Sequence, residues 1–239
     1  MASVATFNSR LLVGSINLTP YLTDASPSFN QEMLEVTTLN DTGKSYIPGL
    51  TEYTMSLKGF LDPSGTANAQ FDQLKSWVAL TGGQPVTFAP RGLTGGTEAV
   101  MVNGLAAQLN EGAAVGGVVS FDVNVQADTL GDIGKMLTTT VPTTASTNES
   151  SSNNGAATSN GLVAHLHVLA YSGLTNVVVK VQSSSDNVTF GTDVITFSTV
   201  SGLTSERKTA SGTVGQYLRV SSTVTGTGSI SYYVAVARR

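Results

Sequence analysis

A stretch of 24 residues, 138–161, divides this 239-residue chain into two parts of different character. It reads TTTVPTTASTNESSSNNGAATSNG, contains no aromatic residue and carries a single charge, that of Glu149. Such a composition buries too little apolar area to offset the entropy of ordering the chain. Structureless loops of this length are uncommon inside compact domains. We therefore expect an N-terminal domain over 1–137, a linker over 138–161 and a C-terminal domain over 162–239.

The N-terminal part is predicted to consist of strands around one helix. Residues 119–126 alternate strictly between apolar and polar side chains, which is typical of a strand with one buried and one exposed face. Over 66–80 the apolar residues recur at helical spacing, directly after the turn residues Asp-Pro-Ser-Gly. Further strands are expected over 31–39, 53–58, 85–88 and 99–108.

The C-terminal part has short strands at regular spacing and no helical stripe. The turns between them are rich in Ser, Gly, Asp and Asn. This pattern favours an antiparallel β-sandwich, so the fold class predicted for the whole chain is mainly β. The strands of the sandwich are expected over 162–171, 176–182, 193–198, 216–222 and 229–237.

Charge is divided unevenly between the two parts. Residues 1–135 carry six basic and twelve acidic residues, a net charge of −6, whereas 162–239 carry six basic and three acidic residues, a net charge of +3. An acidic domain argues against tight nucleic-acid binding, which needs Lys and Arg on the phosphates. The chain has no cysteine, which excludes disulfides and thiolate sites. We expect no membrane insertion, because no run of about 18 apolar residues occurs. We expect no secretory signal, because the first eight residues contain no basic stretch followed by an apolar core.

Three patterns that could carry chemistry have weak support. Gly-Lys-Ser at 43–45 resembles the end of a phosphate-binding loop, but Thr38 replaces an earlier glycine and Tyr-Ile-Pro-Gly follows where a helix is needed. His165 and His167 would lie on one strand face and could share a metal, but no acidic residue beside them supplies a third ligand. The acid pairs Glu32 with Glu35 and Asp128 with Asp132 are interpreted as solvated charges. We expect no enzyme activity, no cofactor and no metal site.

The segment EVTTLNDTGKSYIPGL at 35–50, followed by TMSLKGFLD at 54–62, resembles the major tail (tail tube) proteins of long-tailed bacteriophages. The shared pattern is V-T-x-L-x-D, a basic or polar turn, Y-x-P-G-L, and a strand that ends in G-x-x-D. In the family a helix, a strand and a final hairpin follow, in the order expected here. The resemblance covers about residues 1–135.

This resemblance implies a tail-tube-like β-sandwich or barrel with one flanking helix, assembled as stacked hexameric rings. Each subunit would add strands to a continuous inner barrel, and an acidic wall would repel DNA phosphates. The candidate lumen face is the polar side of the strand over 119–126: Ser120, Asp122, Asn124 and Gln126. The loop that precedes the Tyr46–Gly49 turn would contact the neighbouring ring, through Asp41, Lys44, Tyr46, Pro48 and Gly49.

The expected function is that of a structural virion protein, made in the bacterial host cytoplasm, that self-assembles into a tail tube for DNA ejection. QSSSDNVTF at 182–190 and GQYLRV at 215–220 suggest that the C-terminal sandwich is galactose-binding-like rather than immunoglobulin-like. It would decorate the tail, with host cell-surface glycans as a candidate ligand. The other expected partners are further copies of the chain, other tail proteins, and DNA that passes without specific binding. Two alternatives stay open: a capsid decoration or head–tail joining protein, and a carbohydrate-binding surface module.

Overall fold

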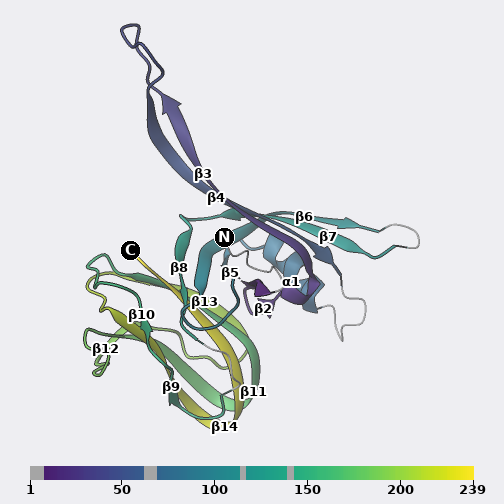
Figure 1. The fold of residues 1–239 in the computed structure, drawn as a ribbon. Coiled ribbons are helices and arrows are strands. Elements are labelled where there is room, and N and C mark those ends of the chain that lie inside the picture. Colours follow the sequence, from purple (N-terminus) through teal and green to yellow (C-terminus); the bar gives the residue numbers. More distant parts are fainter. Residues whose placement is uncertain (1–7, 62–68, 114–116, 139–142) are drawn as a thin grey trace. The chain divides into compact units, whose positions relative to one another are not determined.

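The computed structural model describes residues 8–61, 69–113, 117–138 and 143–239 (Figure 1). The chain forms two compact units. The first unit takes the described residues up to Pro20 together with 84–103 and 132–239, and the second takes 21–83 and 104–131. The prediction of a mainly β fold is confirmed, with a single α-helix among the described residues. That helix has ten residues, and no described helix is long and apolar enough to cross a membrane.

The second unit is an antiparallel sheet of four strands with one helix. In their order across the sheet, the strands are β3 (Leu22–Glu35), β4 (Tyr46–Phe60), β7 (Ser120–Ala127) and β6 (Glu98–Gly112), of which residues 104–112 belong to this unit. The helix, α1 (Ala69–Val78), lies inside the range predicted from apolar spacing. Trp77 of α1 is 1% exposed, and its Nε1 donates a hydrogen bond to the carbonyl oxygen of Gly104 at 2.8 Å. This buried bond fixes α1 to β6.

The alternation in the sequence gives this sheet one buried and one exposed face. Met55 of β4 lies opposite Val125 of β7, and Leu57 lies opposite Val123. All four of these side chains are at most 2% exposed. A shift of one residue in register would move this apolar set to the solvent face, so the register is strongly specified.

The first unit is built around two long paired strands, β11 (Leu162–Ser184) and β14 (Tyr217–Arg238). Its other elements are β1 (Arg10–Val13), β2 (Ile16–Asn17), β5 (Gln84–Ala89), β8 (Asp132–Met136), β9 (Thr147–Asn148), β10 (Ser152–Asn153), β12 (Thr192–Thr196) and β13 (Thr204–Ala210). A 3-10 turn, η2 (Thr19–Tyr21), follows β2.

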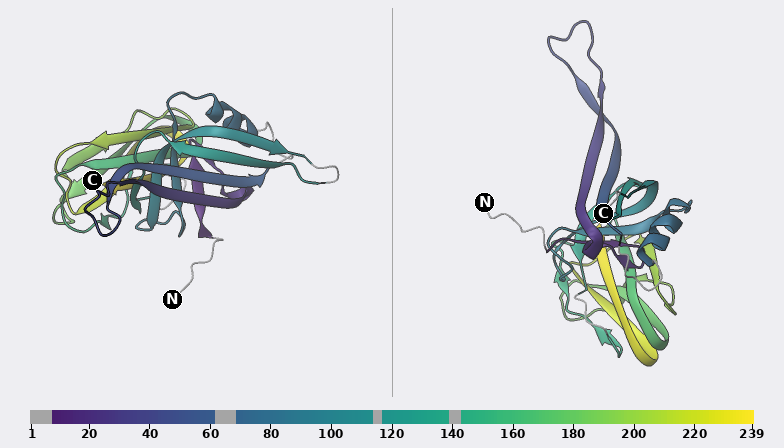
Figure 2. Two further views of the ribbon diagram at one scale, coloured as in Figure 1. Left: turned by 90° about the horizontal axis from the view of Figure 1, so that it is seen from above. Right: turned by 90° about the vertical axis from the view of Figure 1, so that its right-hand side faces the viewer.

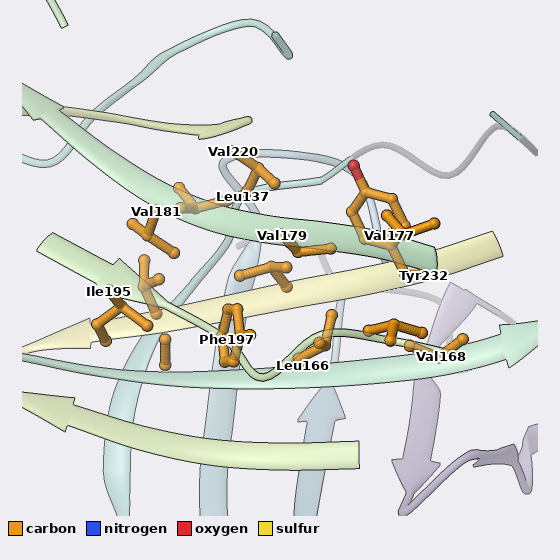
Figure 3. Close-up of a cluster of buried hydrophobic side chains, with 14 of the residues drawn as sticks. Leu137, Leu166, Val168, Val177, Val179, Val181, Ile195, Phe197, Val220 and Tyr232 are labelled. Atoms are coloured by element: carbon orange, nitrogen blue, oxygen red, sulfur yellow. The ribbon is translucent and has the colours of Figure 1, made fainter. Parts of the chain in front are cut away.

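Four of the strands predicted for the C-terminal part are the two halves of β11 and the two halves of β14. The pairing of the long strands shifts register between Val168 and Asn176, where bulges bend the ribbon. Glycine is needed at this bend: Gly226 has a φ of 98°, and a Cβ on Gly228 would lie 1.9 Å from the Ser172 carbonyl oxygen. Because of the bend, both halves of the ribbon contribute to one apolar core (Figure 3).

The described part of the Ser/Thr/Asn-rich segment lies along β14. Thr143 pairs with Ile230, β9 pairs with β14 through Asn148 and Ser221, and β10 pairs with it through Ser152 and Leu218. Backbone pairing of this kind needs no apolar side chains, which is why composition alone does not reveal it. The boundaries of the two compact units accordingly differ from the expected boundaries at 137 and 162.

A nearly buried ion cluster in the first unit makes one prediction about stability. The carboxylate of Asp132 is 9% exposed and lies 3.4 Å from Nη2 of Arg207 and 3.3 Å from Nε of Arg239. Asp132→Ala should lower the free energy of unfolding by about 3 kcal/mol, because it leaves two arginines without their counter-charge. Denaturant unfolding monitored by circular dichroism measures this loss. The control is Asp193→Ala in the more exposed pair with Lys180, which should cost less than about 1 kcal/mol. Equal losses in the two variants would contradict the prediction.

Candidate assembly surfaces

The four residues predicted to face a lumen lie on one face of β7: Ser120, Asp122, Asn124 and Gln126. Their side chains are half-buried or exposed, whereas the three residues between them are at most 2% exposed. The fold therefore gathers these four residues on the solvent side of the second unit's sheet.

Polar residues of the neighbouring strands extend this surface. Lys58 of β4 lies opposite Asp122, with 3.9 Å between Nζ and Oδ2, and opposite Asp24 of β3. Asn124 donates from Nδ2 to Oε1 of Gln108 on β6 at 3.3 Å. We call this surface the polar face: Asp24 and Ser26 of β3, Thr54, Ser56 and Lys58 of β4, Gln108 of β6, and Ser120, Asp122, Asn124 and Gln126 of β7. The alternation over 53–58 indicated the β4 members, but the pairing register that joins them to β7 could not be predicted.

β3 forms an edge of this sheet. Among the described strands it pairs only with β4, along most of its 14 residues. Its other side presents backbone groups that no described strand covers, although Pro27 removes one donor from the strand. A long open edge is a template for pairing with another chain.

β3 and β4 continue beyond the sheet as a two-stranded arm, residues 31–50 (Figures 1 and 2). Every residue of the arm is exposed except Gly49, which is half-buried. Apolar side chains occupy both of its faces, because Leu34 pairs with Ile47 on one face and Met33 pairs with Pro48 on the other. The large exposed apolar residues of the arm are Met33, Leu34, Val36, Leu39, Tyr46, Ile47 and Leu50. Exposed apolar surface of this extent marks an interaction site.

The five residues predicted to contact a neighbouring ring all lie in the arm: Asp41, Lys44, Tyr46, Pro48 and Gly49. Asp41 closes the turn at the tip, where its Oδ2 accepts a hydrogen bond from the backbone N–H of Thr38 at 2.7 Å. Nζ of Lys44 lies 3.0 Å from Oε2 of Glu35. The expected turn at 46–49 is wrong, since these residues begin β4. Proline is tolerated there because a two-stranded ribbon leaves every second N–H toward solvent.

A cleft of about 610 Å³ lies at the base of the arm, between β3, β4 and the segment after β7. Its lining includes the carboxylates of Glu32, Glu52 and Asp128 and the side chains of Leu50 and Leu130. These leucines are 83% and 60% exposed. Tyr53 also lines the cleft, and the cleft brings together three segments that are distant in the sequence.

The remaining sequence candidates have structural roles. Glu35 pairs with Lys44, and Asp132 belongs to the ion cluster of the first unit, so neither acid pair forms a site. Gly-Lys-Ser at 43–45 lies in the tip of the arm and leads into a strand. Within the described ranges, no group of three or more His, Asp or Glu side chains is arranged to hold a metal.

The two histidines are buried on the face of β11 that packs against β5. Oγ1 of Thr87 lies 3.2 Å from Nδ1 of His165 and 2.8 Å from Nε2 of His167. Nδ1 of His167 donates to the carbonyl oxygen of Gly14 at 2.7 Å, which leaves its Nε2 as the acceptor for the Thr87 hydroxyl. Burial lowers the pKa of both rings, that of His167 to about 4, and the Arg207 charge lowers the pKa of His165 further. The pair therefore packs as neutral imidazoles.

No protein-family model matches the chain, and no curated protein matches its sequence. Solved structures with a similar arrangement include a chain from the virion of a native gene transfer agent particle, which is 11% identical and covers 55% of this chain and 98% of its own, with a TM-score of 0.45. The SPP1 Dit protein, described as a hub adsorption apparatus protein of phages that infect Gram-positive bacteria, is 15% identical. It covers 96% of this chain and 98% of its own, with a TM-score of 0.41. The SPP1 tail tube structure is 11% identical and covers 54% of this chain and 78% of its own, with a TM-score of 0.42.

Proposed function

We propose that this chain is a structural subunit of a phage tail, without catalytic activity, and that it assembles into hexameric rings that stack into a tube. The observation that carries the proposal is the arm, which exposes apolar side chains on both faces. A two-stranded ribbon with no core of its own is marginally stable in water. Further copies of the chain, packed against both faces, would supply the cover that the monomer lacks.

Ring closure would use the sheet of the second unit. The open edge of β3 would pair with the sheet of the neighbouring copy, so that six copies form one continuous barrel and no edge stays exposed. A barrel of about 24 strands, spaced about 4.8 Å apart and tilted by about 40°, is about 48 Å across between backbones. Such a barrel leaves a wide channel.

The polar face would line this channel. It holds Asp24 and Asp122 against Lys58, so each copy contributes one net negative charge at neutral pH. The excess acid would repel DNA phosphates, and the amides and hydroxyls of the face would keep it hydrated. DNA would therefore pass without specific binding.

The arm would connect one ring to the next through the region of Asp41, Lys44, Tyr46, Pro48 and Gly49. From residue 31 to residue 35 the extended strand β3 spans about 13 Å, and the segment 36–45 carries the arm further, so that it would leave its own ring. The strands β11 and β14 and their neighbours, where a sandwich domain is expected, would lie on the outside of the tail. There Phe190, with the guanidinium of Arg219 at 4.2 Å from its ring centre, is a candidate platform for host glycans.

A second candidate is a single ring at one end of a tail tube. The size of the first unit, which includes all of 132–239, favours it, because a long tube would have to accommodate this bulk around every ring. The difference between the two candidates is whether rings stack.

Negative-stain electron microscopy of the purified chain over a range of concentrations tests both candidates. Hollow tubes are expected for the tube subunit, and single rings that do not stack are expected for the end ring. Monomers at all concentrations, including in the presence of other tail proteins, would contradict the proposal and would favour a carbohydrate-binding surface module or a capsid protein.

A further inference from the structure

The cleft at the base of the arm is acidic and partly apolar. Glu32, Glu52 and Asp128 place three carboxylates around it, while Leu50 and Leu130 expose most of their surface beside them. Carboxylates around a concave surface attract a cation, and exposed leucines favour an apolar contact. The chemistry of the cleft thus favours a ligand that carries a positive charge and an apolar group.

A buried polar group in the same cleft also lacks a partner. Tyr53 is 2% exposed and lines the cleft, and its hydroxyl makes no hydrogen bond within the described residues. An unsatisfied buried hydroxyl destabilises the fold, and a ligand that supplies a donor or acceptor would offset part of this cost. This observation is independent of the carboxylates.

The tip of the arm carries a positive charge and an exposed apolar side chain, which complement the carboxylates and the leucines of the cleft. The side chain of Lys44 is 67% exposed, and its pairing with Glu35 is a surface ion pair that is easily exchanged for another. Leu39 is fully exposed at the same tip. The tip does not reach its own cleft, because the arm carries it away from the sheet on which the cleft lies (Figure 1).

We propose that the cleft receives the tip of the arm from a second copy of this chain. Lys44 of one copy lies among Glu32, Glu52 and Asp128 of the next, and Leu39 packs against Leu50 and Leu130. The contact joins two different surfaces, so it repeats from copy to copy and generates an open stack. This inference rests on the proposed function, for which it names the acceptor of the contact between rings.

Disulfide trapping tests the contact directly, because the chain contains no cysteine. The double variant Leu39→Cys with Leu130→Cys should give a ladder of covalent multimers on non-reducing gels after mild oxidation under assembly conditions. The control is Leu39→Cys with Leu203→Cys, because Leu203 is 62% exposed and Leu130 is 60% exposed. This control should give at least tenfold less multimer.

Electron microscopy of the same samples separates the two hypotheses. Tubes or stacked rings without a ladder specific to Leu130→Cys would overturn the cleft as the acceptor and leave the proposed function standing. A sample with neither assemblies nor a ladder would reject both.

Charge reversal supplies a second test that does not depend on cysteine geometry. Lys44→Glu and Glu52→Lys should each raise the concentration needed for assembly at least tenfold, since each places like charges in the contact. An equal mixture of the two variants should assemble at a lower concentration than either variant alone, because the glutamate introduced in one tip then meets the lysine introduced in the next cleft, although Glu32 and Asp128 leave that cleft with one net negative charge. The control is Glu111→Lys, an exposed acid of the same unit outside the cleft, which should neither block assembly nor rescue Lys44→Glu. Failure of the mixture to assemble would overturn the proposed pairing.

Discussion

Replacing residues 34–47 with Asn-Gly should abolish assembly and leave the monomer folded. Met33 and Pro48 are directly paired, so a two-residue turn can join them without disturbing β3 or β4 below. All the deleted residues are exposed, and their loss should change the free energy of unfolding by less than about 1 kcal/mol. Sedimentation velocity measures assembly, and denaturant unfolding measures stability.

A variant of unchanged length separates the apolar surface of the arm from its reach. Leu34→Thr with Ile47→Thr removes one directly paired apolar couple, and both residues are about half exposed in the monomer. Loss of this burial should weaken each contact by about 3 kcal/mol and raise the concentration needed for assembly about a hundredfold. The control, Leu80→Thr, changes a leucine of the same unit that is 44% exposed, like Leu34, but lies outside the arm and the cleft, and it should have no effect. Unimpaired assembly by the double threonine variant would show that the apolar residues do not drive association.

Acidification from pH 6.5 to 5 should destabilise the first unit steeply. His165 and His167 are both fully buried as neutral rings, and burial lowers the pKa of His167 to about 4. Below about pH 6.5 the unfolded chain therefore binds protons at both histidines, whereas the folded chain keeps both rings neutral. The free energy of unfolding is therefore highest above that pH and falls as the pH decreases. Well below pH 6.5 each histidine contributes a slope of about 1.4 kcal/mol per pH unit, and because the slope at pH 6.5 is about half of this, the pair should lose about 3 kcal/mol between pH 6.5 and pH 5.

Unfolding free energies measured at several pH values test this slope. The chain has two histidines, and no other side chain has an ordinary pKa in this window. His165→Asn and His167→Asn should each halve the slope, whatever they do to stability at pH 7. Because the Arg207 charge also lowers the pKa of His165, Arg207→Gln should reduce the loss of stability that His165 causes on acidification, but not the loss that His167 causes. A slope that is the same in all variants would assign the acid sensitivity to other groups.

The parts of the fold that the sequence predicted are those with a local periodicity. Strict alternation over 119–126 placed Ser120 and Asp122 on one face of β7, and apolar spacing over 66–80 indicated α1. The same alternation put His165 and His167 on one face of β11. In each case a side-chain period of two or of 3.6 residues is fixed by the backbone geometry itself.

The parts that could not be predicted depend on pairings between distant residues. An arm with apolar side chains on both faces has the same sequence pattern as a strand buried on both faces. The pattern therefore predicts a strand over 31–39, but it does not predict that these residues are exposed. The cleft joins Glu32, Glu52 and Asp128 from three segments whose register no local pattern determines. The bend in β11 and β14 divided each long strand into two predicted ones, because turn-like residues at a bulge have the composition of a loop.

The division of the chain into units also determines the order in which they can fold during synthesis. The residues of the second unit, 21–83 and 104–131, are all made before β11 and β14, whereas the first unit needs those two strands and β1 from the start of the chain. Contacts of such large sequence separation form slowly. A nascent chain would therefore present its apolar arm before β11 and β14 exist, at a stage when polysomes bring several copies together. Premature association at that stage would be a hazard for folding, and chaperones that mask exposed apolar ribbons would raise the yield of assembly-competent protein.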